Sequence, residues 1–449
     1  MTNLGPSALA LIHPDRALRT VAWRGSRGVN QRQFLRDVRA LASRLPRAPY
    51  ALNLCEDRYH FMTAFAAVCL RGQTNLLPPS RVPGVIAEIA LAYPGCYALG
   101  ETEFADLAAP WVSVGHDAGA ASAGPSAQAV PSVSANHVAA LAFTSGSTGE
   151  PQVHAKTWHS LVQVARMAAQ RFMPAGGGAS IVATVPSQHM YGLETTVMMA
   201  LAGGCAAHAG PTFFPADLRE ALEQTPAPRV LITTPVHLRA CLAARLQFPP
   251  LQLVVSATAP LAPELAAAAE AALGAPVHEI YGCTEAGSIA SRRTVESLVW
   301  ECYAGLRLVR KDGENFVQGA HLTRPVALPD VVEDLGQGRF RLGDRSTDML
   351  KVAGKRASLS DLTTRLMRIP GVSDAVVFVP DTTRGDDARP AALVVAPDLS
   401  EPQILKALEL LIDPVFLPRP LIRLPSLPRN AVGKLPRAAL LAELERGRA

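Results

Sequence analysis

The chain has 449 residues, of which 49% are hydrophobic and 18% are charged, and its formal net charge is +5. A chain of this length exceeds one hydrophobic core, so we expect two or three domains, and its composition excludes an intrinsically disordered protein. The small net charge does not indicate a nucleic-acid partner, because such proteins cluster Lys and Arg with interleaved aromatic residues.

The first 115 residues alternate between helix-like and strand-like segments. Apolar residues at helical spacing predict a helix over 31–45, a short apolar run predicts a strand over 50–55, and residues 61–70 are typical of a buried helix. Residues 116–135 are rich in Ala, Gly, Ser and Pro, which predicts a surface connection.

The alternation is clearer from residue 139 to residue 280. The predicted strands are 139–143, 180–185, 229–233, 251–256 and 276–280, and the predicted helices are 158–172, 194–202, 235–246 and 262–273. This order favours a mostly parallel sheet covered by helices, and such sheets bind ligands at the carboxyl ends of their strands.

Shorter strand-like pieces follow at 306–309, 315–317 and 339–342. A last unit begins near residue 348, with predicted strands at 375–379 and 391–395 and a predicted helix at 401–412. This last unit is large enough to form a separate small domain.

Cysteine usage and the N-terminus bear on location. The seven cysteines lie far apart, with no Cys-x-x-Cys pair and no zinc-ligand spacing, which favours reduced thiols. The chain does not open with a basic leader and an apolar stretch, and its apolar runs are too short to span a bilayer. We therefore expect a soluble, cytoplasmic protein without membrane insertion.

The strand predicted at 139–143 leads into a run of small polar residues. This run is Thr144, Ser145, Gly146, Ser147, Thr148 and Gly149. Glycine lets backbone N–H groups turn toward a ligand and the hydroxyls add donors, so the run could wrap phosphate oxygens. It is not a Walker loop, because no Gly-Lys-[Ser/Thr] closes it. By itself, a flexible polar turn is the more common interpretation.

Two further stretches follow predicted strands. Tyr281, Gly282, Thr284 and Glu285 come after one strand, where Glu285 could hold Mg²⁺ and Tyr281 could stack on a base. His189 follows another strand, although a lone loop histidine is more often structural than catalytic. A loop glutamate is likewise usually only solvated.

The last two stretches lie toward the C-terminus. Residues 328–356 form a charged passage punctuated by glycine, for which an ordinary interdomain linker is the alternative. Lys434 follows Gly433 on a predicted turn, where a solvated surface charge is the alternative.

In this order and at these separations, the five stretches resemble the superfamily of adenylate-forming enzymes, which comprises acyl- and aryl-CoA synthetases, adenylation domains and luciferases. The resemblance covers most of the chain from about residue 138 to residue 440. It implies an α/β fold with a large N-terminal domain (1–346) of stacked α/β subdomains and a small β-rich subdomain. A mobile α+β C-terminal domain (347–449) would follow and would carry Lys434.

The resemblance also implies roles for the nucleotide-binding residues. Thr144 to Gly149 would form the phosphate loop, and Ser256 to Leu261 would form the adenine-binding turn, in which Ala257, Thr258 and Ala259 would bind the nucleotide. Tyr281, followed by Gly282, would stack on the adenine.

Around the reacting groups, Thr284 would contact the α-phosphate and Glu285 would bind Mg²⁺. His189 would lie beside the substrate carboxylate. Lys434 would neutralise charge as the carboxylate attacks the α-phosphate.

Three aspartates compete for contact with the ribose: Asp330, Asp334 and Asp344. We choose Asp330 because it lies eight residues before Gly338, the spacing typical of the family, and Arg345 then takes the family's arginine position.

The sequence departs from the family pattern at three places. The lysine that usually follows the phosphate-loop proline is Gln152, and Lys156 lies close enough to replace it, which is a hypothesis. Asp344 stands where the family has the glycine of a Gly-Arg pair. The hinge aspartate corresponds to Thr347 or to the neighbouring Asp348.

Residues 52–81, together with two later runs, resemble the short AMP-ligases of aryl polyene and xanthomonadin-type pigment clusters. This implies ATP-dependent activation of a small carboxylic acid, with an aryl acid such as a hydroxybenzoate favoured. The acyl group would pass to CoA or to the phosphopantetheine of an acyl carrier protein. Synthetases for medium- or long-chain fatty acids, a luciferase-like oxygenase and a non-catalytic nucleotide-binding relative remain alternatives.

Overall fold

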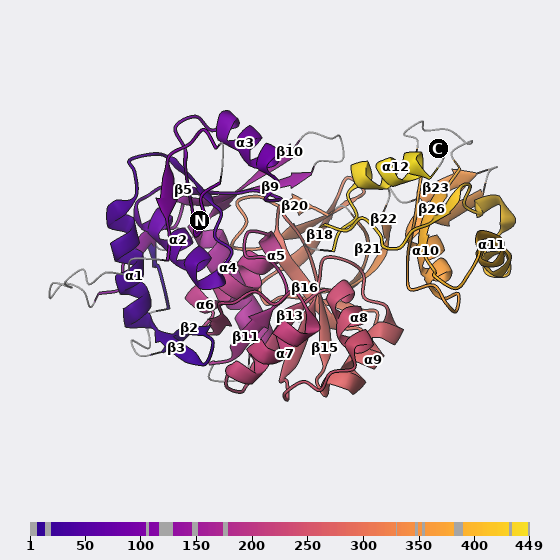
Figure 1. Ribbon diagram of the computed structural model, residues 1–449, viewed down its shortest axis with the longest axis horizontal. Helices are drawn as coiled ribbons and strands as arrows, with labels where there is room; N and C mark the ends of the chain where they lie inside the picture. Colours follow the sequence, from indigo (N-terminus) through magenta and orange to yellow (C-terminus); the bar gives the residue numbers. More distant parts are fainter. Residues whose placement is uncertain are drawn as a thin grey trace. The chain divides into compact units, whose positions relative to one another are not determined.

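The computed structural model describes residues 7–13, 19–104, 107–115, 129–145, 151–173, 178–328, 330–345, 349–352, 355–380, 389–430 and 433–447 (Figure 1). The chain divides into two compact units. The first contains Met1–Val309, Phe316–Val326 and Gln337–Arg339, and the second contains Arg310–Asn315, Ala327–Gly336 and Phe340–Ala449. The domain boundary expected at 346/347 falls on residues 346–348, outside the described residues, and stays a prediction.

The first unit contains two large sheets. One has the strand order β10-β9-β5-β4-β6-β7. Its strands are β10 (Pro151–Thr157), β9 (Val138–Ser145), β5 (Thr74–Leu77), β4 (Tyr50–Asn53), β6 (Tyr97–Gly100) and β7 (Trp111–Ser113). Only β10 is antiparallel to its neighbour among these pairs, and the others run parallel.

The helices of this part are α1 (Gln31–Arg44), α2 (Arg58–Leu70) and α3 (Pro83–Ala92). Helix α2 is buried on all sides, which matches its almost uniformly apolar sequence. At its start, the buried Arg58 donates hydrogen bonds to the carbonyls of His208, Ala183 and Val185 at 2.8, 3.0 and 3.0 Å. This side chain therefore ties α2 to the second sheet, whose strands contribute those carbonyls or lead into them.

Within the first unit, the second sheet has the order β17-β16-β15-β14-β13-β11-β12-β2-β3. Its strands are β17 (Trp300–Cys302), β16 (Gly287–Arg293), β15 (Val277–Cys283), β14 (Leu253–Ser256), β13 (Arg229–Thr233), β11 (Ser180–Ala183), β12 (Ala206–His208), β2 (Thr20–Arg24) and β3 (Arg27–Asn30). From β15 to β2 the neighbours are parallel, whereas β16, β17 and β3 are added antiparallel.

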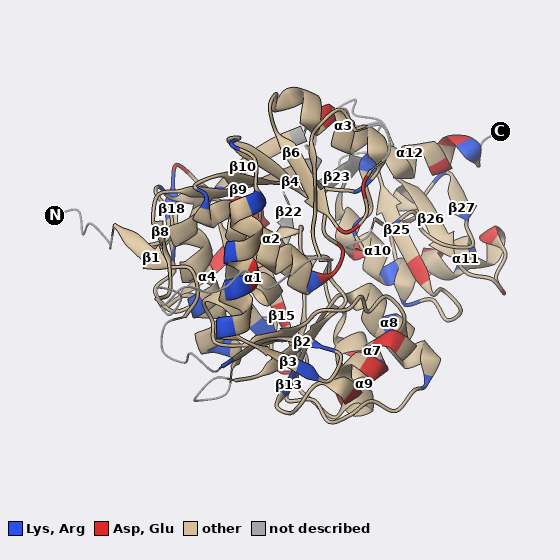
Figure 2. Ribbon diagram, turned by 60° about the vertical axis from the view of Figure 1, so that its left-hand side comes forward, with Lys and Arg blue, Asp and Glu red and all other residues tan. Residues whose placement is uncertain are grey.

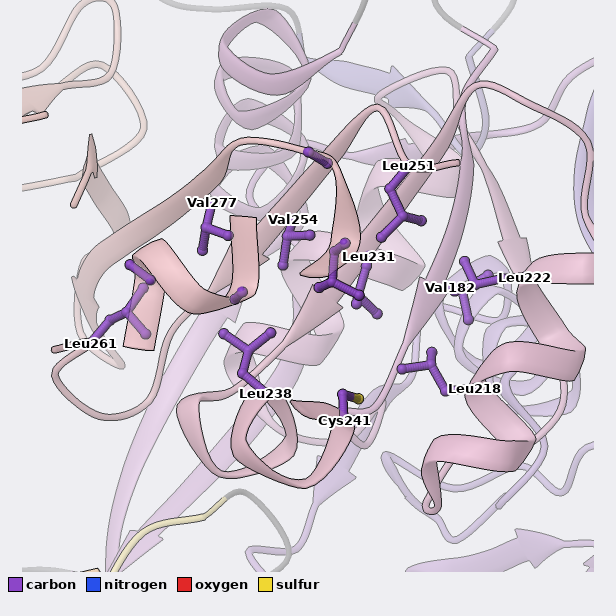
Figure 3. Packing of buried hydrophobic residues seen from close by; sticks show 14 of the residues in the cluster. Val182, Leu218, Leu222, Leu231, Leu238, Cys241, Leu251, Val254, Leu261 and Val277 are labelled. Atoms are coloured by element: carbon purple, nitrogen blue, oxygen red, sulfur yellow. The ribbon is translucent and has the colours of Figure 1, made fainter. Parts of the chain in front are cut away.

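Helices cover this sheet and create its core. They are α4 (Trp158–Phe172), α5 (Met190–Gly192), the π-helix η2 (Leu193–Met198), α6 (Met199–Leu201), α7 (Pro215–Gln224), α8 (Pro235–Ala244) and α9 (Pro263–Leu273). Figure 3 shows Val254 and Val277 of the sheet facing Leu238 of α8, while Leu218 of α7 lies near Val182 at the other end of the same cluster. The opposite sides of α7 and α9 carry acidic residues at the surface (Figure 2), so both helices are amphipathic.

A short pair, β1 (Ala8–Ala10) and β8 (Ser132–Ser134), is antiparallel. The connecting strands are β18 (Arg307–Lys311), β19 (Glu314–Gln318), β20 (Val326–Ala327), β21 (Asp330–Gly336) and β22 (Arg339–Arg345). The rest of the second unit contains β23 (Met349–Val352), β24 (Lys355–Ser358), α10 (Leu359–Met367), β25 (Asp374–Phe378), β26 (Ala391–Val395), α11 (Glu401–Glu409), the 3₁₀ helix η4 (Pro414–Phe416), β27 (Leu421–Arg423) and α12 (Arg437–Arg446).

The second unit has its own core. Strands β25, β26 and β27 form one sheet, antiparallel at the first pair and parallel at the second. One apolar cluster includes Leu366 of α10 and Leu408 of α11, and another includes Leu440 and Leu444 of α12. A sheet with helices packed on it is the α+β arrangement expected for the C-terminal part.

The α/β fold class is confirmed, and most predicted elements lie within a few residues of those observed. The helix predicted over 194–202 is present as the π-helix η2 followed directly by α6. The surface connection predicted over 116–135 ends in β8, and its residues 116–128 lie outside the described part. In the part of the chain that the structure describes, no helix is long and apolar enough to cross a membrane.

Candidate active site

Two of the predicted nucleotide-binding stretches of the first unit, 257–259 and 281–285, lie toward the carboxyl ends of neighbouring parallel strands. Thr233 of β13 is the register partner of Ser256 of β14, and Ser256 is the partner of Glu279 of β15. The turn 257–259 and the segment 281–285 directly follow these positions. Parallel sheets expose polar backbone and loop residues at this edge, so the arrangement matches a ligand site.

The turn after β14 has a strained backbone. Thr258 adopts a φ of 80°, a left-handed conformation that is unusual for a β-branched residue. Such strain costs on the order of 1–3 kcal/mol and persists only where the surroundings impose it. Here Ala257 donates its N–H to the carbonyl of Thr233 at 3.4 Å, and Leu261 donates its N–H to Oε1 of Glu279 at 2.9 Å.

Glu279 is a buried carboxylate that holds this turn. Its Oε2 lies 2.7 Å from Nη2 of Arg292 and 3.3 Å from Oγ1 of Thr294. Burial raises the pKa of Glu279, and the Arg292 charge and the hydrogen bonds lower it in part. This pair could not be predicted from the sequence, because its members belong to different strands and only the pairing of β15 with β16 brings them together.

Tyr281 lies on the same side of β15 as Glu279, because alternate residues of a strand share a face. Its ring centroid is 5.6 Å from that of Trp300 at an interplanar angle of 56°, and the Arg292 guanidinium lies 4.5 Å from the Trp300 ring centroid. Tyr281 is thus supported by packing and is 9% exposed. The next residue, Gly282, has no room for a side chain, because a Cβ there would lie 2.4 Å from the Gly287 carbonyl oxygen.

Thr284 and Glu285 follow at the surface of the site. The Glu285 side chain is 46% exposed, and its Oε1 lies 3.8 Å from Nδ1 of His154 on β10. Among the described residues no group of three or more His, Cys, Asp or Glu could hold a metal ion. Mg²⁺ is commonly bound by one or two carboxylates together with substrate phosphates, so a single accessible carboxylate fits that mode of binding.

Three buried side chains hold the backbone of the segment that contains Glu285. Lys156 of β10 donates from Nζ to the Glu285 carbonyl at 2.8 Å, and His321 donates from Nε2 to the Ala286 carbonyl at 3.1 Å. Glu194 of η2 accepts from the N–H of Ser288 at 3.0 Å and from its hydroxyl at 2.7 Å. Burial lowers the pKa of Lys156 and raises the pKa of Glu194, while each charge partly offsets the shift of the other.

His189 begins α5 in the loop after β11, where a compact turn positions it. Gly192 has no room for a side chain, because a Cβ would lie 2.0 Å from the Pro186 carbonyl oxygen. The hydroxyl of Tyr191 donates to the Val255 carbonyl at 2.9 Å, which ties this turn to β14. His189 therefore lies at the same edge of the sheet as the 257–259 turn. A residue that contacts the substrate carboxylate would have to lie there.

The predicted phosphate loop is described only at its beginning. Thr144 and Ser145 end β9 and are the register partners of Gln152 and Pro151 on β10. Residues 146–149 (Gly146, Ser147, Thr148 and Gly149) lie outside the described residues, so their predicted role stays a prediction.

Three predicted residues belong to the second unit. Asp330 begins β21 and Arg345 ends β22. Lys434 is exposed on a turn in which its N–H donates to Oδ1 of Asn430 at 2.9 Å and its carbonyl accepts from the Asn430 N–H at 2.8 Å. Gly433 precedes it with a φ of 77°, which suits glycine. The catalytic and ribose-binding roles of these three residues remain predictions.

Comparison with known proteins identifies the family. The family model for AMP-binding enzymes matches residues 41–306, and the chain therefore belongs to this family of adenylate-forming proteins. The matched range includes every candidate residue found at the strand ends of the first unit.

The relatives include CoA ligases. A 4-coumarate–CoA ligase of Rhodobacter capsulatus is 30% identical over 57% of this chain, and one of Halorhodospira halophila is 29% identical over 67%. The chain spans 63% of the first relative's length and 75% of the second's. Enterobactin synthase component F of Escherichia coli is 25% identical over 69% of the chain, which covers 29% of that protein.

Solved structures agree on the fold. An anthranilate CoA ligase in complex with anthranoyl-AMP matches 98% of each chain, with a TM-score of 0.76 and 17% identity. The o-succinylbenzoate CoA synthetase of Bacillus subtilis with its acyl-adenylate matches 94% of this chain and 95% of its own, with a TM-score of 0.77 and 17% identity. These structures support the fold, whereas the match to the AMP-binding family model confirms the predicted superfamily; the narrower pigment-cluster subtype stays a prediction.

Proposed function

We propose that this protein joins a carboxylic acid to AMP at the expense of ATP and then passes the acyl group to a thiol. The observation that carries the proposal is the assembly, within an AMP-binding enzyme, of the 257–259 turn, Tyr281 and Glu285 at one edge of the parallel sheet. A base, a triphosphate and a carboxylate can each be recognised there by residues of suitable chemistry.

In the first step a carboxylate oxygen attacks the α-phosphorus of ATP. A new C–O–P linkage forms, the bond between the α-phosphorus and the bridging oxygen breaks, and pyrophosphate leaves with that electron pair. Both reactants are anions, so the catalytic task is positioning and charge neutralisation. Thr284 would donate to the α-phosphate, His189 would orient the acid, and Lys434 would offset the developing charge. Asp330 and Arg345 would hold the ribose side of the nucleotide.

Glu285 would hold Mg²⁺, which when bound supplies neutralisation of the triphosphate charge. The accessible carboxylate and its anchored backbone support this assignment. Among the described residues no group of three or more possible ligands surrounds it, which is consistent with a metal held mainly by the nucleotide's own phosphates.

In the second step a thiol sulfur attacks the acyl carbon, a thioester forms, the acyl–oxygen bond breaks and AMP leaves. The thiol proton passes to solvent or to the leaving group. A movable C-terminal domain suits such a two-step reaction, because closure can exchange one set of residues at the site for another.

For the acid we favour an aryl acid such as a hydroxybenzoate. The resemblance to pigment-cluster AMP-ligases supports this choice, and relatives and structural neighbours are named for 4-coumarate, anthranilate and o-succinylbenzoate. A medium- or long-chain fatty acid is the alternative substrate.

For the acceptor, an acidic carrier protein would need a basic surface, and the arginines of the C-terminal segment could supply one; several of them have partners within the chain. Arg429 pairs with Asp374 at 2.8 Å, Arg446 pairs with Glu443 at 2.6 Å, and Arg437 donates to the Val379 carbonyl at 2.9 Å. The two ion pairs reduce the net positive charge of this surface, so CoA and carrier-protein phosphopantetheine should be tested side by side.

The experiment is acid-dependent exchange of labelled pyrophosphate into ATP, with benzoates, cinnamates and fatty acids of increasing length. We expect exchange with at least one aryl acid and loss of exchange in Glu285→Gln. Exchange only with fatty acids would redirect the substrate class. Nucleotide binding without exchange for any acid would favour a non-catalytic relative, and acid-dependent O₂ consumption would indicate a luciferase-like oxygenase.

A further inference from the structure

Three side chains that come from distant parts of the sequence meet under the segment 285–288. Lys156, Glu194 and His321 are 4%, 2% and 5% exposed, so all three are buried. Lys156 bonds to the carbonyl of Glu285 and His321 to the carbonyl of Ala286, and Glu194 accepts from the N–H and the hydroxyl of Ser288. We call these three residues the 285–288 clamp.

Burying this clamp is costly unless its charges are matched. An uncompensated ammonium or carboxylate in a protein interior is strongly unfavourable, and a partner of opposite charge offsets the penalty. Glu194 is the leading favourable charge for Lys156, and Lys156 is a favourable charge for Glu194. Lys156 and Glu194 together therefore carry no net charge, and both form hydrogen bonds with the segment 285–288.

The surrounding backbone is shaped for Glu194. This residue lies on the π-helix η2, and such widened turns occur often at functional sites. Opposite it, Gly287 has a φ of 79°, and a Cβ at that position would lie 2.5 Å from Oε1 of Glu194. The carboxylate therefore occupies the space that a side chain at residue 287 would need.

Strand β10 approaches Glu285 from one face. Alternation along the strand puts Gln152, His154 and Lys156 on the same side. The His154 ring lies near the Glu285 carboxylate, whereas the Lys156 amine bonds to the Glu285 carbonyl. One strand thus contacts both the side chain and the backbone of the proposed metal ligand.

We propose that Lys156 is a positioning residue. It orients Thr284 and Glu285 by holding the Glu285 carbonyl and does not contact the triphosphate itself. Its amine is buried and bonded to a carbonyl, so its influence on the nucleotide passes through the 284–288 segment. The inference rests on the proposed function for its catalytic consequence, whereas the hold on the segment can be measured without any reaction.

The test compares Lys156→Met, which removes the charge and the donors, with Lys156→Arg, which keeps both. The first readout is hydrogen exchange of the amides at 284–288 in the whole protein without ligand. In Lys156→Met we expect about tenfold faster exchange of this segment, since loss of one buried hydrogen bond and its charge is worth at least a factor of ten. In Lys156→Arg we expect most of the protection to return.

The second readout is the Mg²⁺ concentration at half-maximal ATP binding, measured by calorimetry without acid. We expect a several-fold rise in Lys156→Met, with little change in affinity for AMP. The matched control is Arg58→Met, which also removes a buried cation bonded to carbonyls. It should lower the unfolding temperature without speeding exchange at 284–288 or shifting the Mg²⁺ dependence.

Weaker ATP binding in Lys156→Met with unchanged exchange at 284–288 and unchanged Mg²⁺ dependence would overturn the proposal in favour of direct contact with phosphate. No change in any readout would overturn it as well. If Lys156→Met does not fold, Ser288→Ala removes one bond to Glu194 and should show a smaller effect in the same direction. Loosened 284–288 amides in a protein that activates no acid would leave the clamp standing and refute only the proposed function.

Discussion

The buried ion pair of Glu279 and Arg292 offers a sharp prediction about the nucleotide-binding turn. Arg292→Met keeps the length and apolar part of the side chain and removes its charge. It leaves Glu279, whose side chain is 5% exposed, without its cation while Leu261 still donates to it. Breaking a buried pair in this way costs about 3–5 kcal/mol of unfolding free energy.

The cost should depend on pH. Burial already raises the pKa of Glu279, and Arg292 counteracts this, so Arg292→Met raises the pKa further. A carboxyl group with a raised pKa in the folded protein destabilises it fully above that pKa. The penalty falls as pH decreases toward the unfolded value, because the folded protein takes up the proton first. The loss of stability in Arg292→Met should therefore be largest near neutral pH and smaller in acid.

Denaturant unfolding of both proteins between about pH 5 and pH 8 measures this difference directly. The double variant Glu279→Gln with Arg292→Met should recover part of the loss, because it leaves no buried charge unpaired. A penalty that is equal at every pH, or a double variant no more stable than Arg292→Met, would refute the reasoning.

Three further predictions concern the same unit and the C-terminal turn. Gly287→Ala should lower the free energy of unfolding by more than about 2 kcal/mol, because a side chain there would combine a positive φ with a clash against Glu194. Gly274→Ala, with a φ of 63° and open space around it, should lower it by about 1 kcal/mol. Chemical denaturation of both variants measures the difference. Thr258→Gly should raise the unfolding free energy by about 1 kcal/mol through release of backbone strain, and an unfolding free energy below that of the parent would contradict the assignment of strain. Lys434→Ala should abolish pyrophosphate exchange but leave thioester formation from synthetic acyl-AMP intact, with the thioester measured by chromatography. Equal loss of both activities would argue against a role specific to adenylation.

Much of the fold follows from local patterns in the sequence. The helix at 158–172 and the strand at 391–395 coincide with α4 and β26, because apolar periodicity and length are strong signals for isolated elements. The order of the motifs also identifies the family, since their spacing reflects the order in which strand ends reach the site.

The 285–288 clamp could not be read from the sequence. Lys156 and Glu285 are 129 positions apart, and only the pairing of sheets and helices brings them together. Glu194 stands in an apolar run, where an acid is a weak sign of a buried polar contact. The helix around it is predicted from the sequence, but its π geometry has no distinctive local pattern.

The most direct test of acid activation follows an oxygen atom. The wild-type protein is incubated with ATP, the thiol acceptor and an aryl acid whose carboxylate carries ¹⁸O, and the products are analysed by mass spectrometry. Attack of the carboxylate on the α-phosphorus predicts AMP that contains one ¹⁸O atom from the acid. Unlabelled AMP, or label found in inorganic phosphate together with ADP, would contradict formation of an acyl-adenylate.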